Sequence, residues 1–212
     1  ERDNEVGLTH HIWTRCRQWK NLLKDNKYKH LFVKIMQDAQ VKFEFELNAF
    51  ILMSNHCHLI ITTVNEQDTI SRIMQYVKMR VSRNWNIMNN EIGPFWNERF
   101  RSRKIDEKVP EFDLNWLLWY VAYNPVKKDI KENVQRQRIN SKERVIMMDP
   151  RDFEFSSIKA YLDDDYESPV EITLHPLFLG LGKTPEERRE EFLHFETLYK
   201  EKLYSTYKAL LL

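Results

Sequence analysis

Two histidines stand one residue apart at the head of an apolar run, in the stretch NHCHLIIT at residues 55–62. In a β-strand, residues i and i+2 share a face, so we expect His56 and His58 to point the same way and Cys57 to face the core on the other side. Two imidazoles on one face could hold a divalent metal ion if a third ligand joins them. The spacing is also compatible with two ordinary half-buried histidines.

A second candidate group lies in WYVAYNPV, residues 119–126, where Tyr120 and Asn124 are four residues apart on a predicted helix and so share a face. The Asn124 side-chain oxygen could bind a hard cation. The phenol of Tyr120 could attack a phosphate, but with a pKa of about 10 it needs help from a metal ion or a base at neutral pH. The alternative is that Tyr120 and Tyr123 pack in the core like the tryptophans beside them.

Charge is distributed unevenly along the chain, although the formal net charge is only +1. Residues 70–144 contain 16 Lys and Arg against 9 Asp and Glu, whereas residues 149–212 contain 8 against 14. The basic segment also holds Trp96 and Phe100, which could stack on bases or pack in the core. Basic and aromatic residues together suit single-stranded nucleic acid, and a solvated charged face is the alternative.

The candidate phosphate contacts come from the first strand, from a helix and from an alternating strand across RFRSRK. They are Arg15, Lys78, Arg80, Arg83, Arg99, Arg101 and Arg103.

Composition predicts an ordinary globular protein, since 42% of the 212 residues are hydrophobic and only four are glycine. No apolar stretch approaches the roughly 20 residues of a spanning helix, and the first residues do not resemble a signal peptide. Two cysteines could form at most one disulfide. These features favour a soluble, intracellular protein.

Hydrophobic periodicity predicts an α+β fold, with helices packed on a mostly antiparallel sheet. Helices are expected within 20–43, from 70 to about 88 after a cap at Asp68 or Thr69, and from Asp113 to near Asn124, where Pro125 intervenes. Strands are expected at 8–16, 45–54, 56–63 and 95–105, with the central hairpin in mid-sheet. An α-rich tail follows, with helices at 155–162 and from Pro185 towards Tyr207.

Six blocks of the chain, in the same order, resemble the single-tyrosine HUH transposases, and most closely their REP-associated tyrosine transposase branch. The blocks are HIWTRC (11–16), NAFILMSNHCHLIITT (48–63), SRIMQYVKMRVSRNWN (71–86), GPFWNERFRSRKIDE (93–107), WYVAYNPVKK (119–128) and FEFSSIKAYL (153–162). A seventh, HPLFLGLGKTPEERREEF (175–192), resembles the C-terminal extension of that branch.

The resemblance implies a ferredoxin-like fold, Mg²⁺ or Mn²⁺ held by His56, His58 and Asn124, and Tyr120 as nucleophile. It further implies a nickase and strand transferase that acts on single-stranded or hairpin DNA through a 5′-phosphotyrosine intermediate. The expected domains are a catalytic domain at 1–130, a variable linker or loop at 131–149 and an extension at 150–212 packed on the same domain. The protein is then expected in the cytoplasm with the nucleoid.

The sequence leaves two alternative functions and one question of assembly. One is a hairpin-binding protein that has lost turnover. A zinc hydrolase is disfavoured because the chain has no H-E-x-x-H motif. In assembly, the acidic extension favours a monomer over a homodimer.

Overall fold

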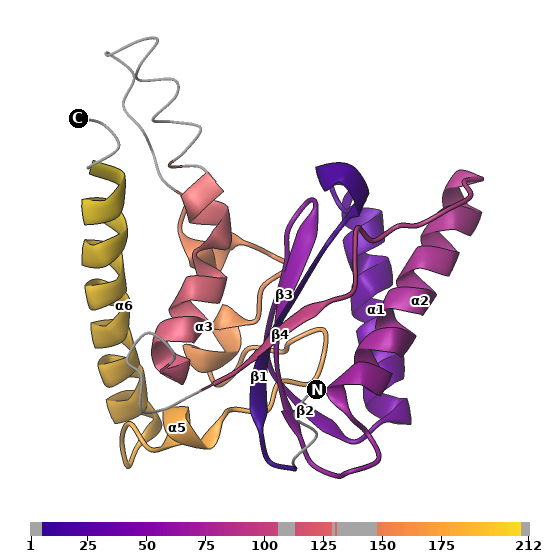
Figure 1. Ribbon diagram of the computed structural model, residues 1–212. Helices are drawn as coiled ribbons and strands as arrows, with labels where there is room; N and C mark the ends of the chain where they lie inside the picture. The colour runs from indigo at the N-terminus through magenta and orange to yellow at the C-terminus, as the bar shows by residue number, and fades with distance from the viewer. Residues whose placement is uncertain (1–5, 106–112, 129, 131–147, 209–212) are drawn as a thin grey trace. The chain divides into compact units, whose positions relative to one another are not determined.

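Four antiparallel strands form one sheet, in the order β2-β3-β1-β4 (Figure 1). They are β1 (Thr9–Arg15), β2 (Phe45–Leu52), β3 (His56–Thr63) and β4 (Arg101–Lys104). The computed structural model describes residues 6–105, 113–128, 130 and 148–208. With helices α1 (Asn26–Lys42) and α2 (Ile70–Asn89), the chain order β-α-β-β-α-β and this sheet order make the ferredoxin-like α+β fold that the sequence predicts.

The described residues form two compact units. The first contains the sheet, α1, α2 and a returning segment, Asp165–Thr173. The second contains the remaining helices: α3 (Leu114–Ala122), the 3₁₀ turns η3 (Pro150–Asp152) and η4 (Ile158–Tyr161), α5 (Pro176–Leu179) and α6 (Pro185–Lys208). This division does not follow the proposed boundaries at 130 and 149, and most of the linker proposed at 131–149 lies outside the described residues.

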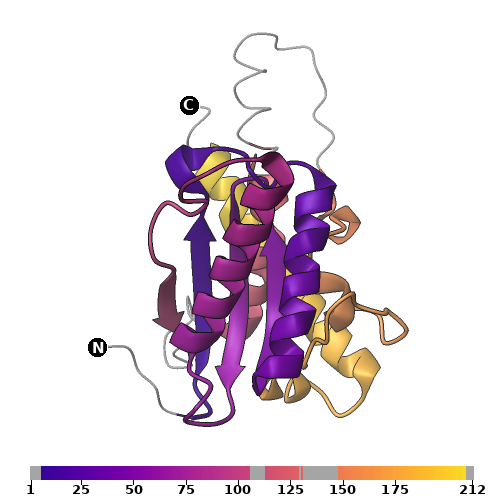
Figure 2. The same ribbon diagram turned by 90° about the vertical axis from the view of Figure 1, so that its right-hand side faces the viewer.

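Both helices of the first unit lie on the same face of the sheet (Figures 1 and 2). The Thr69 hydroxyl caps α2 by accepting from the Arg72 amide, and four apolar residues that form one stripe are fully buried along the helix. They are Ile73, Met74, Val77 and Val81. On the covered sheet face, Ile12, Cys57, Leu59 and Ile61 are likewise fully buried. This face is the core of the unit.

The returning segment lies along β2, an edge strand of the sheet. The Thr173 amide donates to the Leu47 carbonyl at 3.0 Å, and the Asn48 amide group donates to the Thr173 carbonyl at 3.0 Å. The acidic tail therefore protects part of a sheet edge, which otherwise exposes unpaired backbone groups. The expectation that the β2-β3 hairpin lies in mid-sheet is correct for β3 and wrong for β2.

In the second unit, Asp113 caps helix α3, because its carboxylate accepts from the amides of Asn115 and Trp116. The helix ends at Ala122, and residues 124–128 are helical again after a turn at Tyr123. Pro125 fits this second start because the first turn of a helix needs no amide donor there. The break predicted near Asn124 is thus correct.

Two predicted elements are shorter in the structure. The strand expected over 95–105 is regular only at Arg101–Lys104, and the helix expected over 155–162 is the 3₁₀ turn η4. Upstream of β4, Trp96 forms an isolated antiparallel bridge with Cys16, in which the Asn97 amide donates to the Arg15 carbonyl. The pairing with β1 is then interrupted and resumes at Arg101. Across the described ranges, no helix has the length and apolar character needed to span a membrane.

Candidate functional site

His56 and His58 lie on the face of the sheet opposite α1 and α2. Their partners across the ladder are Arg15 and Trp13 of β1, which share that face. Between them Cys57 points to the core, where burial raises the pKa of its thiol, as it raises the pKa of Cys16 to about 12. Both cysteines are free and buried. Cys57 is therefore a core residue, as the sequence predicts.

The side chain of Asn55 determines which ring nitrogen of His56 donates a hydrogen bond. Asn55 donates through Nδ2 to the Trp19 carbonyl at 3.3 Å, which orients the amide so that Oδ1 lies 2.7 Å from His56 Nδ1. An amide oxygen only accepts, so Nδ1 of His56 is the donor, and in the neutral imidazole Nε2 then carries the lone pair. A lone pair on Nε2 is what a metal ligand requires.

His58 has a histidine neighbour that sequence reasoning missed. His11 Nε2 lies 2.9 Å from His58 Nδ1, and the two rings are stacked with centroids 5.1 Å apart. The His56 and His58 rings are also close, with centroids 5.2 Å apart at a steep angle. If His58 donates from Nδ1, its Nε2 carries a lone pair like that of His56. The alternating positions 11, 13 and 15 are visible in the sequence, but the register that brings His11 to His58 is not.

The two imidazoles suit a divalent cation, because each histidine can offer Nε2 on the same face of the sheet. Within the part of the chain that the structure describes, no group of three or more His, Cys, Asp or Glu side chains could hold a metal ion. The third ligand that the resemblance implies, Asn124, belongs to the second unit and offers an amide oxygen.

Tyr120 and Asn124 belong to the second unit, on and after α3. Tyr120 is 37% exposed on a helix whose other aromatic residue of the same turn, Trp119, is fully buried. Asn124 donates through Nδ2 to the carbonyls of Tyr120 and Val121, both at 3.1 Å, and this leaves Oδ1 as the atom suited to a cation. The alternative that Tyr120 packs in the core is therefore wrong.

Tyr123 is the tyrosine that packs in the core. Its hydroxyl donates to Glu196 Oε1 at 2.7 Å, and burial together with that carboxylate raises the pKa of the phenol. Burial opposes the ionisation of Glu196, but hydrogen bonds from Arg151, Tyr123 and Lys200 outweigh it and lower the pKa of the carboxyl. Trp119 also donates to the Phe192 carbonyl at 2.9 Å. These contacts fix α3 against α6 (Figure 1).

Lys127, a residue that the sequence analysis did not single out, lies over the ring of Tyr120. Its Nζ is 3.5 Å from the ring centroid and donates to the Tyr120 carbonyl at 3.2 Å. A cation over an aromatic face stabilises the ring in one orientation. The spacing of seven residues, two helical turns, is the signal that could have found it.

The structure thus brings together two sets of residues, each inside one unit. His11, His56 and His58 form the set on the sheet, and Tyr120, Asn124 and Lys127 form the set on the helices.

The basic residues predicted to contact phosphates do not form one cluster. Arg101 and Arg103 face the histidine side of the sheet, because they pair with Trp13 and His11 of β1. Arg15 also lies on this face, opposite His56. Arg99 lies before β4, so its expected place on the alternating strand is wrong.

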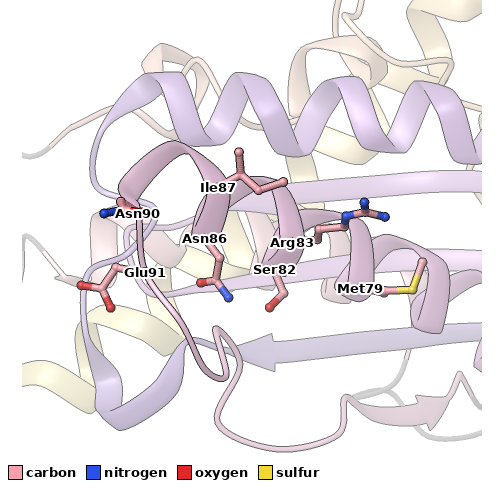
Figure 3. Close-up of a pocket in the computed structure, with 7 residues that line it drawn as sticks. All are labelled: Met79, Ser82, Arg83, Asn86, Ile87, Asn90 and Glu91. Carbon is pink, nitrogen blue, oxygen red and sulfur yellow. The ribbon is translucent and has the colours of Figure 1, made fainter.

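The basic residues of α2 are on the helical side of the sheet and point in different directions. Lys78 donates to the Glu98 carbonyl, and Arg80 pairs with Asp38 of α1 at 3.4 Å. Arg83 is exposed beside a shallow hollow of about 690 Å³ along the last turns of α2, where Asn86 and Glu91 lie (Figure 3). The three residues do not share a surface with the histidines.

Trp96 and Phe100 are core residues and not stacking platforms. Both are buried, and the indole of Trp96 donates to the Lys78 carbonyl at 3.0 Å. The core alternative weighed from the sequence is the correct one.

Among solved structures, the chain is similar to a REP-associated tyrosine transposase bound to a REP hairpin, with a TM-score of 0.51 and 19% identity over 74% of this chain and 95% of that chain. At this identity the likeness concerns the fold. A putative transposase from Deinococcus radiodurans matches at a TM-score of 0.38, with 15% identity over 65% of this chain and 95% of its own. A bacterial tRNA(His) guanylyltransferase-like protein in complex with ATP matches at 0.44, with 9% identity over 77% and 74%.

A search of curated protein sequences gave no match. The family model described as IS200-like transposase matches residues 5–114, which include His56 and His58 and end before Tyr120. Because this match spans just over half of the 212 residues, the chain belongs to the IS200-like transposase family.

Proposed function

We propose that this protein cuts single-stranded DNA beside a hairpin and rejoins the cut end elsewhere, with Tyr120 as the nucleophile. The observation that carries the proposal is the pair of imidazoles on one sheet face, each with its Nδ1 at hydrogen-bond distance from a neighbouring side chain, in a member of the IS200-like transposase family. Such an arrangement prepares two Nε2 atoms for one cation.

In the proposed reaction, the Tyr120 hydroxyl oxygen attacks the phosphorus of a phosphodiester and loses its proton. The bond from phosphorus to the 3′ oxygen breaks, and that oxygen leaves as a hydroxyl after taking up a proton. The products are a 5′-phosphotyrosine and a free 3′-hydroxyl. Attack by another 3′-hydroxyl on the phosphotyrosine reverses the chemistry and releases Tyr120, so the energy of the phosphodiester bond is conserved.

His56, His58 and Asn124 are the proposed ligands of Mg²⁺ or Mn²⁺, which when bound would draw negative charge from the scissile phosphate. Neighbouring side chains orient the proposed ligands and the nucleophile. Asn55 keeps the proton of His56 on Nδ1, and the interaction of Asn124 through Nδ2 keeps its amide in one orientation. Lys127 orients the Tyr120 ring and adds positive charge over its face.

The proposed substrate is a DNA hairpin with an unpaired flank. Arg15, Arg101 and Arg103 share the histidine face and are suited to hold phosphates close to the point of cutting. A solved relative of the same fold is bound to a REP hairpin, which supports this class of substrate. Coverage of the β2 edge by Thr173 supports action as a monomer.

The test is a covalent adduct on a denaturing gel, with 5′- and 3′-labelled hairpin DNA in Mn²⁺ or Mg²⁺. The wild-type protein should retain only the label on the 5′-phosphate side of the cut, and Tyr120→Phe should retain none while it still binds the hairpin. Tyr204→Phe is the matched control, because Tyr204 is 39% exposed, close to the 37% of Tyr120. Hairpin binding by the wild-type protein without any adduct would contradict the proposal and favour a binding protein without turnover.

A further inference from the structure

Trp19 is an exposed tryptophan held beside the histidine pair. Its side chain is 62% exposed, and it follows β1 in the short 3₁₀ turn η1 (Arg17–Trp19). Its carbonyl accepts from Asn55, the same side chain whose Oδ1 bonds His56. One residue therefore links the Trp19 backbone to a proposed metal ligand.

The backbone at this tryptophan is strained. Gln18 and Trp19 have φ values of 50° and 59°, in the left-handed region where residues with a Cβ pay a steric cost. Such strain persists only where the surrounding structure enforces it, and it concentrates at functional sites. A glycine would adopt this conformation without cost, so the strain calls for a reason to keep an indole here.

The turn that carries Trp19 is anchored on both sides. The Arg17 amide donates to the Phe95 carbonyl at 2.8 Å, and the Leu23 amide donates to the Ser54 carbonyl at 2.8 Å. The Ser54 hydroxyl further bonds Asn21 at 3.1 Å. Both flanks are therefore bonded to segments that adjoin strands β3 and β4, so the backbone that carries the exposed indole is fixed beside the sheet.

Arg15 supplies positive charge to the same spot. Its guanidinium lies 4.2 Å from the centroid of the Trp19 ring, and its strand position is opposite His56. The guanidinium covers part of the ring, and the exposed remainder is open to a flat ligand. A flat aromatic ligand attached to a phosphate, that is, an unpaired nucleotide, matches an indole next to an arginine.

We infer that Trp19 and Arg15 form a nucleotide subsite in which one unpaired base of the substrate stacks on the indole, next to the histidine pair. The inference rests on the proposed function, since it assumes single-stranded DNA at this face. It adds a base-contacting residue, which places one chosen nucleotide against the sheet before the backbone is cut. Stacking tolerates any base, so the subsite fixes position more than sequence.

The test uses hairpin DNA with 2-aminopurine, a fluorescent base quenched by stacking, at each unpaired flanking position in turn. Wild-type protein should quench one position, and Trp19→Phe should keep most of this effect, whereas Trp19→Leu and Trp19→Gly should abolish it. Loss of the indole should weaken binding roughly five- to a hundredfold without changing the salt slope. Val41→Ala, at an exposed position on α1, is the control that should change nothing.

Trp19→Gly also separates function from folding. Because glycine relieves the left-handed strain, this variant should melt no lower than the wild type while it loses quenching. Equal quenching in the wild type and Trp19→Gly would overturn the subsite. So would a loss of hairpin affinity that comes only from a lower salt slope, because that would indicate a lost phosphate contact and not a lost stacking contact.

The Tyr120 adduct is measured on the same DNA. An adduct with no quenching dependent on Trp19 overturns the subsite alone, whereas quenching dependent on Trp19 without an adduct overturns the proposed strand transfer alone.

Discussion

The Nε2 atom of His11 and the Nδ1 atom of His58 lie 2.9 Å apart on neighbouring strands. His58 belongs to the H-x-H motif, and His11 lies outside it. A metal-ligating imidazole is oriented by the hydrogen bond that its other nitrogen makes. His11 is therefore expected to orient His58 and to keep its Nε2 ready for a cation.

Replacing His11 by Ala should weaken Mn²⁺ binding by about 10- to 100-fold, because His58 loses the partner that orients its ring. His11→Gln, which retains an acceptor at a similar distance, should recover most of the affinity. The measurement is an EPR titration of free Mn²⁺ without DNA. His30→Ala, on the exposed surface of α1, is the control. Unchanged affinity in His11→Ala would mean that the contact is packing alone.

Replacing Lys127 by Met should slow adduct formation by about 5- to 30-fold, since the cation over the Tyr120 ring orients it and is worth about 1–2 kcal/mol. Hairpin affinity and Mn²⁺ affinity should stay as in the wild type. The single-turnover rate of adduct formation measures the effect, and Lys128→Met controls for the loss of a charge at the neighbouring exposed position. A rate that falls equally in both variants would exclude a specific role.

Replacing Glu196 by Gln should lower the free energy of unfolding by about 3 kcal/mol at pH 7, because the buried carboxylate joins Tyr123 to Arg151 and Lys200. Glu201→Gln, at an exposed position of the same helix, should have little effect. Urea denaturation measures both. Equal stability of the two variants would contradict the role given to Glu196.

The Glu196 carboxylate should also make the free energy of unfolding depend on pH. The pKa of Glu196 is lower in the folded protein than its usual value. Its contribution to the free energy of unfolding is therefore complete above about pH 4.3 and is lost as the pH falls through the pKa of the folded state. The stability difference between the wild type and Glu196→Gln should therefore shrink below about pH 4. Denaturation curves from pH 3 to pH 7 test the sign, and a difference that grows in acid would contradict it.

Arg101→Gln and Arg103→Gln should each reduce the salt slope of hairpin binding by about one, as expected for the loss of one phosphate contact on the histidine face. Arg80→Gln should leave the slope unchanged, because Arg80 lies on α2, on the helical side of the sheet and away from the histidine face. Affinities measured between about 50 and 200 mM salt give the slopes. The reverse ranking would place the DNA on the other side of the sheet.

Much of the fold is predictable because the apolar periodicity of α2 and of strands β1 to β3 reflects real burial. The Ile73, Met74, Val77 and Val81 stripe and the caps at Thr69 and Asp113 agree with the structure. Prediction failed at residues 97–100, where the alternation of basic and apolar residues suggests a continuous strand but the pairing with β1 is interrupted between the bridge at Trp96 and Arg101.

The candidate site is less predictable, because its supporting residues meet through strand register and loop geometry. His11 reaches His58 only because Trp13 pairs with His58 in the ladder. Trp19 reaches the Asn55 side chain through a turn with two left-handed residues, and no local pattern announces that shape. The roles proposed for Tyr120 and Asn124 come from the resemblance to a family, whereas the contacts of Trp19 and Lys127 required the structure.

The central claim is that Tyr120 becomes covalently joined to DNA, and mass spectrometry of the trapped adduct tests it most directly. After nuclease and trypsin digestion, the peptide that follows Lys108 and ends at Lys127 contains both Tyr120 and Tyr123. Fragment ions should place a nucleotide 5′-phosphate on Tyr120. A nucleotide on Tyr123 or on any other residue, or a hairpin cut with no nucleotide on the protein, would contradict the claim.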